Sequence, residues 1–538
     1  MNKLDEYQNK AVNAPIEGKK ICVVAGAGSG KTTTLVARIN HLISNGVEPK
    51  DIVCITFTNS ASETIKSRIT EQVGYVGTLH SAMFRILKKQ NPELLVLPDE
   101  TSLEILHKYA TQLRFKKKSR KFLSIQRRVF WKSDTNEGES SSINKLKQLY
   151  LNHVQSINAY DYDTILLAGL SMIKEDKSLF PCKYLLVDEY QDSSEIDLEI
   201  YKNLCESQFV VGDPRQAIYG FRGDSAVSFE DIEKEFDELN YLPNNYRSND
   251  KIVSLANQIQ SSFGEMKSML PESKGKSLFF AELEDEYDEL HFITNFLNQS
   301  NEETAILCRT NSERIRVEAY LEERGIPYDS NKTLSALDDF WKIDYLLNLY
   351  DNPHSKTASE MYLRKLEPAK SEGYYLSSLD AMPLVKKESD YNIVRFLYEN
   401  GVSKLTLSEL SGRIENFEEI TDTFEFSQSI NSAKQSARVD NDLNIFVGTM
   451  HSSKSKEWDN VIIPFCNEDK IPLRNQDIEQ ERNLFYVACT RARHKIVISC
   501  AKKVNDGYSD VDLIHSKPSR FVDSLIMEES IKIEHLHK

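Results

Sequence analysis

Residues 23–35 read VVAGAGSGKTTTL, in which an apolar run passes through three glycines to a lysine and three threonines. The apolar run predicts a buried strand, and the segment after the glycines has the apolar spacing of a helix. Glycines placed between a strand and a helix permit positive φ angles, so that the backbone N–H groups of the loop can surround an anion. This stretch therefore predicts a phosphate-binding loop at the end of a buried strand.

The residue types in this loop suit a nucleoside triphosphate. The helix that begins near Lys31 adds its N-terminal dipole to the site. The ammonium group of Lys31 can reach the β and γ phosphates, and the hydroxyl group of Thr32 can hold Mg²⁺. An ordinary glycine-rich turn is the alternative, and the combination of strand, GKT and helix argues against it. The residues expected to contact the nucleotide are Ala25, Gly26, Ala27, Gly28, Ser29, Gly30, Lys31, Thr32 and Thr33.

A second segment supplies the carboxylates that a phosphate loop requires. The sequence YLLVDEYQD, residues 184–192, places Asp188 and Glu189 directly after an apolar run. We expect Asp188 to bind Mg²⁺ and Glu189 to orient or deprotonate the attacking water. Two acidic residues after a strand are weak evidence alone, but together with the phosphate loop they predict a site for ATP and its metal.

The composition places limits on the class of protein. A chain of 538 residues predicts roughly two to four domains. Hydrophobic residues make up 40% and charged residues 28% of the chain, which is typical of a globular protein in water. The sequence contains no apolar run long enough for a membrane span, and the polar N-terminus lacks the centre of a secretory signal. Eight scattered cysteines without a CxxC pair argue against a zinc ribbon and favour a cytoplasmic location.

Strand-like runs alternate with helical segments in two parts of the chain, which predicts an α/β fold with parallel sheets. The segments that interrupt these parts are mostly helical, and strands on either side of the first interruption are expected to share one sheet. We expect a first core in residues 1–83 and 160–241 with a helical insert in 84–159, and a second core in 242–345 and 440–538 with a helical insert in 346–439.

The first insert is basic although the chain is acidic overall. Residues 84–160 hold 15 Lys and Arg residues against 7 Asp and Glu residues, whereas the whole chain has a formal net charge of -15. The basic residues are densest in RFKKKSRKFLSIQRR, residues 114–128. A solvated helical face and a nucleic-acid contact both explain this density, and the sequence leaves the two alternatives open.

Several polar and aromatic residues follow strand-like runs, at the edge of an α/β sheet where ligands bind. Hydroxyl and amide groups there suit sugar–phosphate contacts, and aromatic rings suit base stacking, which contributes about 1–3 kcal/mol per base. Each residue alone could be a core or hydrogen-bonded side chain, so only the whole set favours a nucleic-acid strand. The segments are TFTNSASE (56–63) with Phe57, Thr58 and Asn59, GTLHS (77–81) with Thr78 and His80, and GDPRQAIYGFRGD (212–224) with Gln216, Tyr219, Phe221 and Arg222.

The order of these segments resembles that of the UvrD/Rep/PcrA-type superfamily 1A DNA helicases. Nine segments match the family's motifs in the family's order and span residues 4–493, so the resemblance covers nearly the whole chain. It implies two RecA-like P-loop cores with parallel sheets, each carrying a mostly helical inserted subdomain. The matching segments are LDEYQNKAV (4–12, Q motif), AGAGSGKT (25–32, motif I), TFTNSA (56–61, Ia), GTLHS (77–81, Ib), VDEYQD (187–192, II), GDPRQAIYGFRGD (212–224, III), NNYRS (244–248, IV), GTMHSSKSKEWDNVII (448–463, V) and ERNLFYVACTRAR (481–493, VI).

The resemblance implies a role for each matching residue, with ATP and Mg²⁺ as cofactors. The implied roles at the nucleotide are adenine recognition by Gln8, stacking on adenine by Tyr246, ribose contact by Glu457, γ-phosphate sensing by Gln216, and arginine fingers at Arg247 and Arg491. The implied contacts with single-stranded DNA are Phe57, Thr58, Asn59, Thr78, His80, Tyr219, Phe221, Arg222, Thr449 and His451.

Some positions depart from the family's pattern. Motif III has Phe221 where tryptophan is usual, which offers less area for stacking. Motif V has Ser455 in place of a glycine and Lys456 in place of an apolar residue. If the glycine position requires a positive φ angle, Ser455 is strained or the turn is altered. Motif Ia has Ser60 where lysine is usual, and the second insert is short, so duplex engagement is expected to differ.

Three activities are compatible with these residues, and the preferred one is an ATP-driven 3′–5′ DNA helicase that acts on single-stranded and forked DNA. A single-strand translocase would use the same residues, and an ATP-gated DNA-sensing subunit of a nuclease or anti-phage complex would fit the compact size. A P-loop kinase would leave Arg491 and His80 unexplained. A nuclease or a replication or repair protein is a candidate partner, and no membrane partner is expected.

Overall fold

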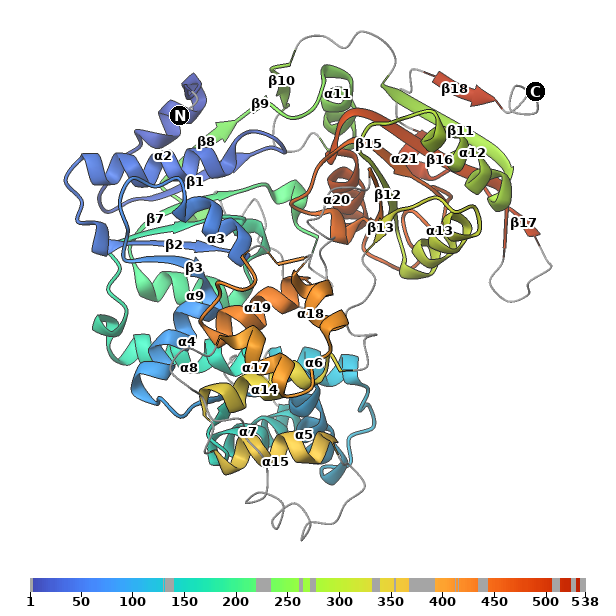
Figure 1. Ribbon diagram of the computed structural model, residues 1–538. Helices are drawn as coiled ribbons and strands as arrows, with labels where there is room; N and C mark the ends of the chain where they lie inside the picture. Colours follow the sequence, from blue (N-terminus) through green and yellow to red (C-terminus); the bar gives the residue numbers. More distant parts are fainter. Residues whose placement is uncertain are drawn as a thin grey trace.

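The computed structural model of the chain describes residues 3–128, 130, 140–218, 234–260, 265–270, 277–330, 339–352, 355–366, 392–411, 413–414, 416–433, 444–505, 513–523 and 529–532. These residues form two largely parallel β-sheets with helices on both faces, and a helical body lies below the first sheet in the view of Figure 1. The arrangement confirms the predicted α/β class. Among the described residues, no helix combines the length and the apolar character needed to cross a membrane.

The first sheet has six parallel strands in the order β3-β2-β6-β7-β1-β8. Strands from both sides of the predicted first insert therefore belong to one sheet, as the sequence predicts. Because all strands are parallel, their carboxyl ends meet at one edge, where ligands bind in such folds. The strands are β1 (Lys20–Ala25), β2 (Ile52–Thr56), β3 (Tyr75–Thr78), β6 (Tyr184–Val187), β7 (Ser207–Gly212) and β8 (Glu238–Leu242).

Alternate residues of strand β1, which lies between β7 and β8, pack on opposite faces of this sheet. Ile21 and Val23 belong to the apolar cluster under α1, α2 and α3, whereas Cys22 and Val24 belong to the cluster under α4, α8 and α9. Such alternation is the period of two expected for a strand that is buried on both faces.

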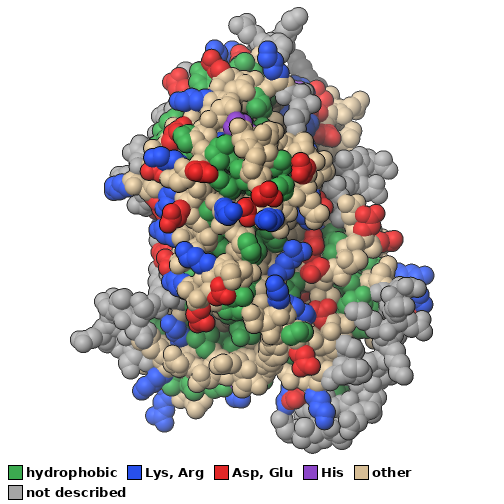
Figure 2. All heavy atoms as spheres, turned by 90° about the vertical axis from the view of Figure 1, so that its left-hand side faces the viewer, with side chains coloured by type: hydrophobic (Ala, Val, Ile, Leu, Met, Phe, Trp, Pro, Cys, Tyr) green, Lys and Arg blue, Asp and Glu red, His purple; other side chains and the backbone are tan. Residues whose placement is uncertain are grey.

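The side of the molecule drawn in Figure 2 shows basic and acidic side chains interspersed. The helices are α1 (Glu6–Val12), α2 (Lys31–Ser44), α3 (Asn59–Lys66), α4 (Leu79–Gln90), α8 (Tyr162–Glu175) and α9 (Glu195–Leu204).

The second sheet has the order β13-β14-β12-β15-β16-β11-β18, and β17 pairs antiparallel with β16. One face is covered by α11 (Asp250–Ile259) and α20 (Ile478–Cys489), and the other by α12 (Glu286–Asn298) and α13 (Asn311–Glu323). The strands are β11 (Leu278–Asp285), β12 (Thr304–Cys308), β13 (Asp329–Ser330), β14 (Ile445–Thr449), β15 (Trp458–Ile463), β16 (Ala492–Asn505), β17 (Leu513–His515) and β18 (Glu529–Lys532), and the short helix α21 (Arg520–Asp523) follows β17. Two small pairs, β4 (Leu95–Val96) with β5 (Ala159–Tyr160) and β9 (Asn244–Asn245) with β10 (Lys267–Ser268), lie outside both sheets.

Helices from both predicted inserts pack into one hydrophobic core, an arrangement that the sequence did not indicate. Leu106 and Leu146 from the first insert share this core with Leu349 and Phe426 from the second. Figure 1 accordingly shows the yellow and orange helices against the blue and cyan ones. The domain limits drawn from the sequence stay a proposal. The helices are α5 (Asp99–Gln112), α6 (Arg120–Arg128), α7 (Ser140–Ser156), α14 (Lys342–Asp351), α15 (Lys356–Leu366), α17 (Ile393–Glu399), α18 (Lys404–Ser411) and α19 (Thr423–Ala433).

One residue of the basic stretch 114–128 has a structural role in this helical body. Arg127 is buried, and its guanidinium group donates hydrogen bonds to Asp163 and Asp99, each at 2.6 Å. A buried guanidinium group with two carboxylate partners is fully engaged by the fold. Arg127 therefore stabilises the contact of α6 with its neighbours and does not face a nucleic acid.

Candidate functional site

The phosphate-binding loop joins β1 to α2 at the carboxyl edge of the first sheet. Gly28 and Gly30 have φ angles of +67° and +79°, a conformation that residues with side chains rarely adopt. A β-carbon on Gly28 would lie 2.7 Å from Cβ of Arg247, and one on Gly30 would lie 2.7 Å from Nε2 of Gln8. Backbone conformation and close packing both require glycine at these two positions, as the sequence pattern indicates.

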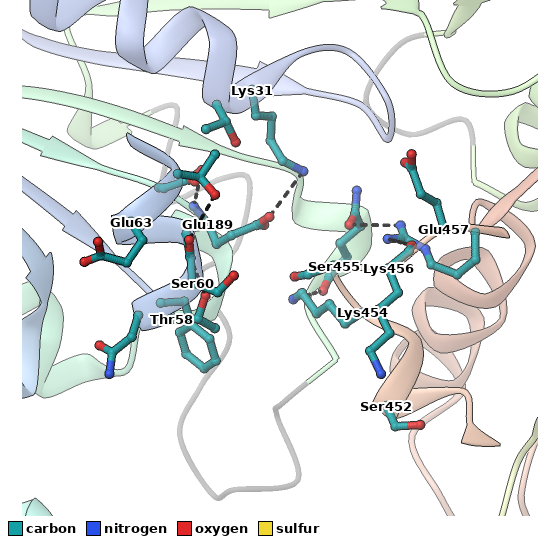
Figure 3. A pocket seen from close by; sticks show the side chains of 18 of the residues that line it. Lys31, Thr58, Ser60, Glu63, Glu189, Ser452, Lys454, Ser455, Lys456 and Glu457 are labelled. Atoms are coloured by element: carbon teal, nitrogen blue, oxygen red, sulfur yellow. Dashed lines mark hydrogen bonds and ion pairs between the residues drawn. The ribbon is translucent and has the colours of Figure 1, made fainter. Parts of the chain in front are cut away.

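Asp188 and Glu189 follow β6 directly, at the same edge of the sheet. The carboxylate of Glu189 lies 3.7 Å from Nζ of Lys31 and accepts a hydrogen bond from Nε2 of Gln191 at 2.6 Å. Glu189 has a φ angle of +50°, which is uncommon for a non-glycine residue. Asp188 is buried, and its carboxylate accepts a hydrogen bond from the backbone N–H of Glu189 at 3.0 Å. The structure therefore brings both carboxylates and the loop lysine together. Figure 3 shows Lys31 and Glu189 facing each other.

The two carboxylates differ in their electrostatic surroundings. Burial, and then the charge of Glu189, raise the pKa of Asp188 to about 7. Burial also opposes the ionisation of Glu189, but the ammonium groups of Lys31 and Lys454 outweigh it and lower the pKa of Glu189 to about 2. Glu189 is therefore ionised at neutral pH. The Asp188 carboxylate is a position where a nearby cation would favour the charged form.

The residues at this edge fit a magnesium ion that is shared with a nucleotide. Mg²⁺ prefers oxygen ligands and usually takes only one or two from the protein, with phosphate oxygens and water completing its shell. The hydroxyl group of Thr32, in the first turn of α2, and the carboxylate of Asp188 line the same cleft and supply such ligands. Within the described part of the chain, no group of three or more His, Cys, Asp or Glu residues could hold a metal ion.

The segment that follows β8 packs against the phosphate loop from the side of the second core. Nδ2 of Asn245 donates to the carbonyl of Ala27 at 2.6 Å, and the backbone N–H of Tyr246 donates to the carbonyl of Gly28 at 2.8 Å. The backbone N–H of Arg247 donates to Oδ1 of Asn245 at 2.9 Å. These bonds fix Arg247 beside the loop, so the structure brings this predicted arginine finger to the nucleotide site.

Arg491 reaches the site from the end of α20 and is 2% exposed. One of its terminal nitrogens contacts Oε1 of Gln216 at 3.4 Å, and Nε2 of Gln216 donates to Asp213 at 2.9 Å. Burial, and then the nearby charge of Arg247, lower the pKa of Arg491 to about 9. A phosphate between the two guanidinium groups would favour the charged form of Arg491 and raise its pKa again. The structure thus places Gln216 and both predicted arginine fingers in one group.

Glu457, the residue implied to contact the ribose, lies between two arginine side chains. Nε of Arg247 donates to one carboxylate oxygen of Glu457, and a terminal nitrogen of Arg493 donates to the other at 2.9 Å. Arg247 and Glu457 therefore form an ion pair with each other in this structure. A nucleotide that contacts both residues must share this pair or open it.

The residues implied to recognise adenine lie together beside the phosphate loop. Asp5 and Gln8 form a capping box at the start of α1, in which the carboxylate of Asp5 accepts from the Gln8 backbone at 2.7 Å. Nε2 of Gln8 donates to the carbonyl of Ser29 at 3.0 Å. The hydroxyl group of Tyr246 donates to Asp5 at 2.6 Å, and Tyr246 is 43% exposed. Tyr246 can therefore offer a ring face for stacking, whereas Gln8 also supports the loop.

A buried ion pair that the sequence analysis did not single out joins the two cores. Nζ of Lys454 donates to both carboxylate oxygens of Asp192, at 2.7 and 2.6 Å, and to the carbonyl of Gln216 at 2.8 Å. The side chains of Lys454 and Asp192 are 6% and 1% exposed. A lysine in motif V and an aspartate in motif II were the signal in the sequence that could have predicted this pair. The pair connects the turn after β6 with the second core at the nucleotide site.

The residues of the first core that were predicted to contact DNA lie at the carboxyl edge of the same sheet. Phe57 follows β2 and is 41% exposed. Thr58 and Thr78 cap α3 and α4, since each hydroxyl group accepts from the backbone N–H three residues later at 3.2 Å. The ring of His80 packs edge-on against Tyr162, with 5.7 Å between ring centroids. Both threonines thus have a local structural role, which the sequence analysis held open as an alternative.

Helix α19, from the second insert, covers part of this edge. Nδ2 of Asn59 donates to the carbonyl of Glu425 at 3.1 Å and to the hydroxyl group of Ser429 at 3.0 Å. The hydroxyl group of Thr78 donates to Oε1 of Gln428 at 2.7 Å. Two of the predicted DNA contacts, Asn59 and Thr78, are therefore hydrogen-bonded to a helix of the same chain.

The predicted contacts of the second core lie at the end of β14. The backbone N–H of Thr449 donates to the hydroxyl group of Ser452 at 3.0 Å, and His451 begins the 3₁₀ turn η8 (His451–Ser453) and lines the cleft. Ser455 has a φ angle of +66°, so this position does require the left-handed conformation. A serine in that conformation is strained relative to glycine.

Three of the predicted DNA contacts lie outside the described residues. These are Tyr219, Phe221 and Arg222, in motif III. Their roles stay predictions from the sequence.

A continuous cleft of about 1520 Å³ connects the two predicted sites. Figure 3 shows Lys31, Thr58 and Glu189 on one wall, and Lys454, Lys456 and Glu457 on the facing wall. The cleft therefore offers room for a nucleotide and for a second ligand beside it. Predicted site residues that line it include Gly28, Lys31, Thr32, Phe57, Thr58, Asn59, Asp188, Glu189, Gln216, Tyr246, Arg247, His451, Glu457 and Arg491.

Comparison with known proteins matches nearly all of the chain to one group. The family model for the UvrD/REP helicase N-terminal domain matches residues 4–237, and the model for the UvrD-like helicase C-terminal domain matches residues 240–370 and 386–503. The chain is 26% identical to the ATP-dependent DNA helicase Rep of Buchnera aphidicola subsp. Baizongia pistaciae, over 97% of this chain and 94% of that protein. It is 23% identical to the ATP-dependent DNA helicase PcrA of Staphylococcus aureus, over 93% of this chain and 83% of that protein.

Proposed function

Because this chain belongs to the UvrD-like helicase family, we propose that it is an ATP-dependent DNA helicase that moves 3′ to 5′ along one strand and separates the duplex ahead of it. The observation that carries the proposal is the position of Arg247 and Arg491. Both belong to the second core or to the segment that leads into it. Arg247 lies against Gly28 of the phosphate loop, and Arg491 contacts Gln216 and lies near Glu189 of the first core. The nucleotide site is therefore complete only when the two cores are in contact.

Hydrolysis would use groups that are already assembled. The loop N–H groups and Lys31 would bind the β and γ phosphates, and Glu189, which is ionised, would accept a proton from the attacking water. Thr32 and Asp188 would hold Mg²⁺, which supplies positive charge to the phosphate oxygens. Arg247 and Arg491 would stabilise the charge that spreads over the γ-phosphate in the transition state.

Coupling to movement follows from the contacts that cross the cleft. Lys454 binds Asp192 and the carbonyl of Gln216, so the turn that carries Gln216 is linked to motif V in the second core. Motif V also carries His451, a predicted strand contact. Loss of the γ-phosphate would therefore change the contact between the two cores. This contact lies near the place where both cores are expected to hold the DNA strand. Repeated closure and opening would give steps along one strand.

Single-stranded and forked DNA are the partners proposed for this activity. Measurement of ATP hydrolysis and unwinding on 3′-tailed, 5′-tailed and blunt duplexes tests it, with Lys31→Ala as the inactive control. We expect unwinding of the 3′-tailed duplex only. Strong ATPase stimulation by single strands without unwinding would indicate a translocase instead, and slow ATP turnover with stable DNA binding would indicate a DNA-sensing subunit.

A further inference from the structure

Lys456 in motif V has no role in the nucleotide site described above, although it stands beside Glu457. It lines the cleft on the side of the second core, and its ammonium group is buried. Figure 3 shows its side chain on the same wall as Ser452.

The ammonium group of Lys456 has no hydrogen-bond partner among the described residues. A lysine carries three N–H donors, and leaving a buried charged donor unpaired is costly. Its ammonium group lies over the ring of Phe446, whose centroid is 4.7 Å from Nζ. Phe446 in turn stacks on Trp458 at 4.9 Å, with 11° between the ring planes. The rings hold the side chain in place but leave its hydrogen-bonding capacity unused.

The charges around Lys456 leave an excess of positive charge. Asp329 on β13 favours its charged form, and Arg413, which follows α18, opposes it. Asp329 and Arg413 both line the cleft with Lys456. An anion with one negative charge would balance this group.

We propose that Lys456 binds a backbone phosphate of the DNA strand, a contact that rests on the proposed function. A phosphodiester carries one negative charge and accepts several hydrogen bonds, which matches the unused donors. The place also fits, because Lys456 follows η8, where His451 is expected to contact the strand, and the cleft runs from there to Phe57 on the first core. The strand would pass along the wall formed by motif V.

The salt dependence of single-strand binding tests this contact. Each phosphate neutralised on a single strand contributes a slope of about −0.7 to log K against log[salt]. We expect Lys456→Met, which keeps an apolar contact with Phe446, to flatten the slope by about 0.7 and to weaken binding of an oligonucleotide by about ten-fold. Lys456→Arg should keep the slope. Lys50→Met is the matched control, because Lys50 is exposed in η1 (Pro49–Asp51), at the opposite edge of the first sheet.

The pH dependence gives a second readout that does not need a destabilising variant. Burial lowers the pKa of Lys456 to about 8 in the free protein. The charge of Asp329 opposes this shift, and the charge of Arg413 adds to it. A bound phosphate raises the pKa, so affinity is full below pH 8 and falls as pH rises above it. Lys456→Arg keeps its charge and should lack this fall. Binding is measured without nucleotide by fluorescence anisotropy.

Three outcomes would overturn the inference. The first is an unchanged salt slope in Lys456→Met, and the second is the same pH profile in Lys456→Arg and wild type. The third is a change in the KM for ATP without a change in the salt slope, which would assign the lysine to the nucleotide. If the wild-type protein binds and unwinds DNA while any of these holds, the proposed function stands and only this contact fails.

Discussion

The two halves of the cleft are built from the same two cores but differ in what their polar groups contact. The nucleotide half comprises Lys31, Glu189, Gln216, Arg247 and Arg491, which converge from both cores on the phosphate loop. The strand half comprises Phe57, Asn59 and His451, and Thr78 lies beside it at the same edge of the first sheet. Here the polar groups Asn59 and Thr78 are hydrogen-bonded to α19.

This difference shows that the polar groups of the nucleotide half contact one another across the two cores, whereas those of the strand half contact the helical body. The contact of α19 with the first core is also apolar, since Phe84 and Phe424 stack at 4.1 Å. Access to Asn59 and Thr78 therefore requires α19 to move, and the shared core of the two inserts would move with it.

The largest effect is expected at the phosphate loop. Lys31→Ala should remove measurable ATP hydrolysis, because positive charge on the transferred phosphoryl group is lost; one such electrostatic contact contributes on the order of 10²–10³ in rate or more. Single-stranded DNA binding should be largely retained, since Lys31 belongs to the nucleotide half. Steady-state ATPase and oligonucleotide binding measure both properties. Normal hydrolysis in this variant would show that the loop is not the nucleotide site.

A large but incomplete loss is expected at the second core. Arg491→Ala should bind ATP and turn it over about 10³-fold more slowly, because an arginine finger contributes about 10³–10⁵ in rate. Nucleotide binding and single-turnover hydrolysis separate the two steps. Arg520→Ala is the control, since Arg520 is an exposed arginine of the same core that pairs with Glu468. An unchanged rate in Arg491→Ala would mean that the second core does not complete the nucleotide half.

A moderate effect of opposite sign is expected in the strand half. Gln428→Ala and Ser429→Ala remove hydrogen bonds that hold α19 on Thr78 and Asn59, each with a net value of about 0.5–1.5 kcal/mol. If DNA must displace α19, each variant should bind single strands about two- to ten-fold more tightly. Ser408→Ala, at an exposed position of α18, is the control. Unchanged or weaker binding would indicate that Asn59 and Thr78 only anchor the helix.

The smallest effect is expected at the turn between the halves. Ser455→Gly should stabilise the second core by about 1 kcal/mol, because glycine adopts the φ angle of +66° without strain. Urea unfolding can be followed by tryptophan fluorescence, since Trp458 lies three residues away in β15. Asn475→Gly, at a φ angle of +63°, is the comparison, and its gain should be smaller because asparagine tolerates this conformation. Equal stability of Ser455→Gly and wild type would show that the serine is not strained.

Much of the nucleotide half could be predicted because its residues belong to short contiguous segments. Gly28, Gly30 and Lys31 lie within four residues, and the loop lies between a strand and a helix that are consecutive in the sequence. The carboxylates of motif II are likewise fixed by the end of β6. The strand β8 was harder to predict because it includes Glu238 and Asn240, and β13 because it has only two residues. The place of each depends on pairing with a strand distant in the sequence.

The amino-acid sequence by itself determined the α/β class, the phosphate loop and the two carboxylates that follow β6, because each depends on local conformation and on residue type. Only the tertiary structure decided that the two inserts form one body, that α19 rests on Asn59 and that Lys454 pairs with Asp192. It also decided that the ammonium group of Lys456 is buried with no hydrogen-bond partner in the described part of the chain. These contacts join residues hundreds of positions apart, or depend on how side chains exclude water, and no local pattern in the chain encodes them.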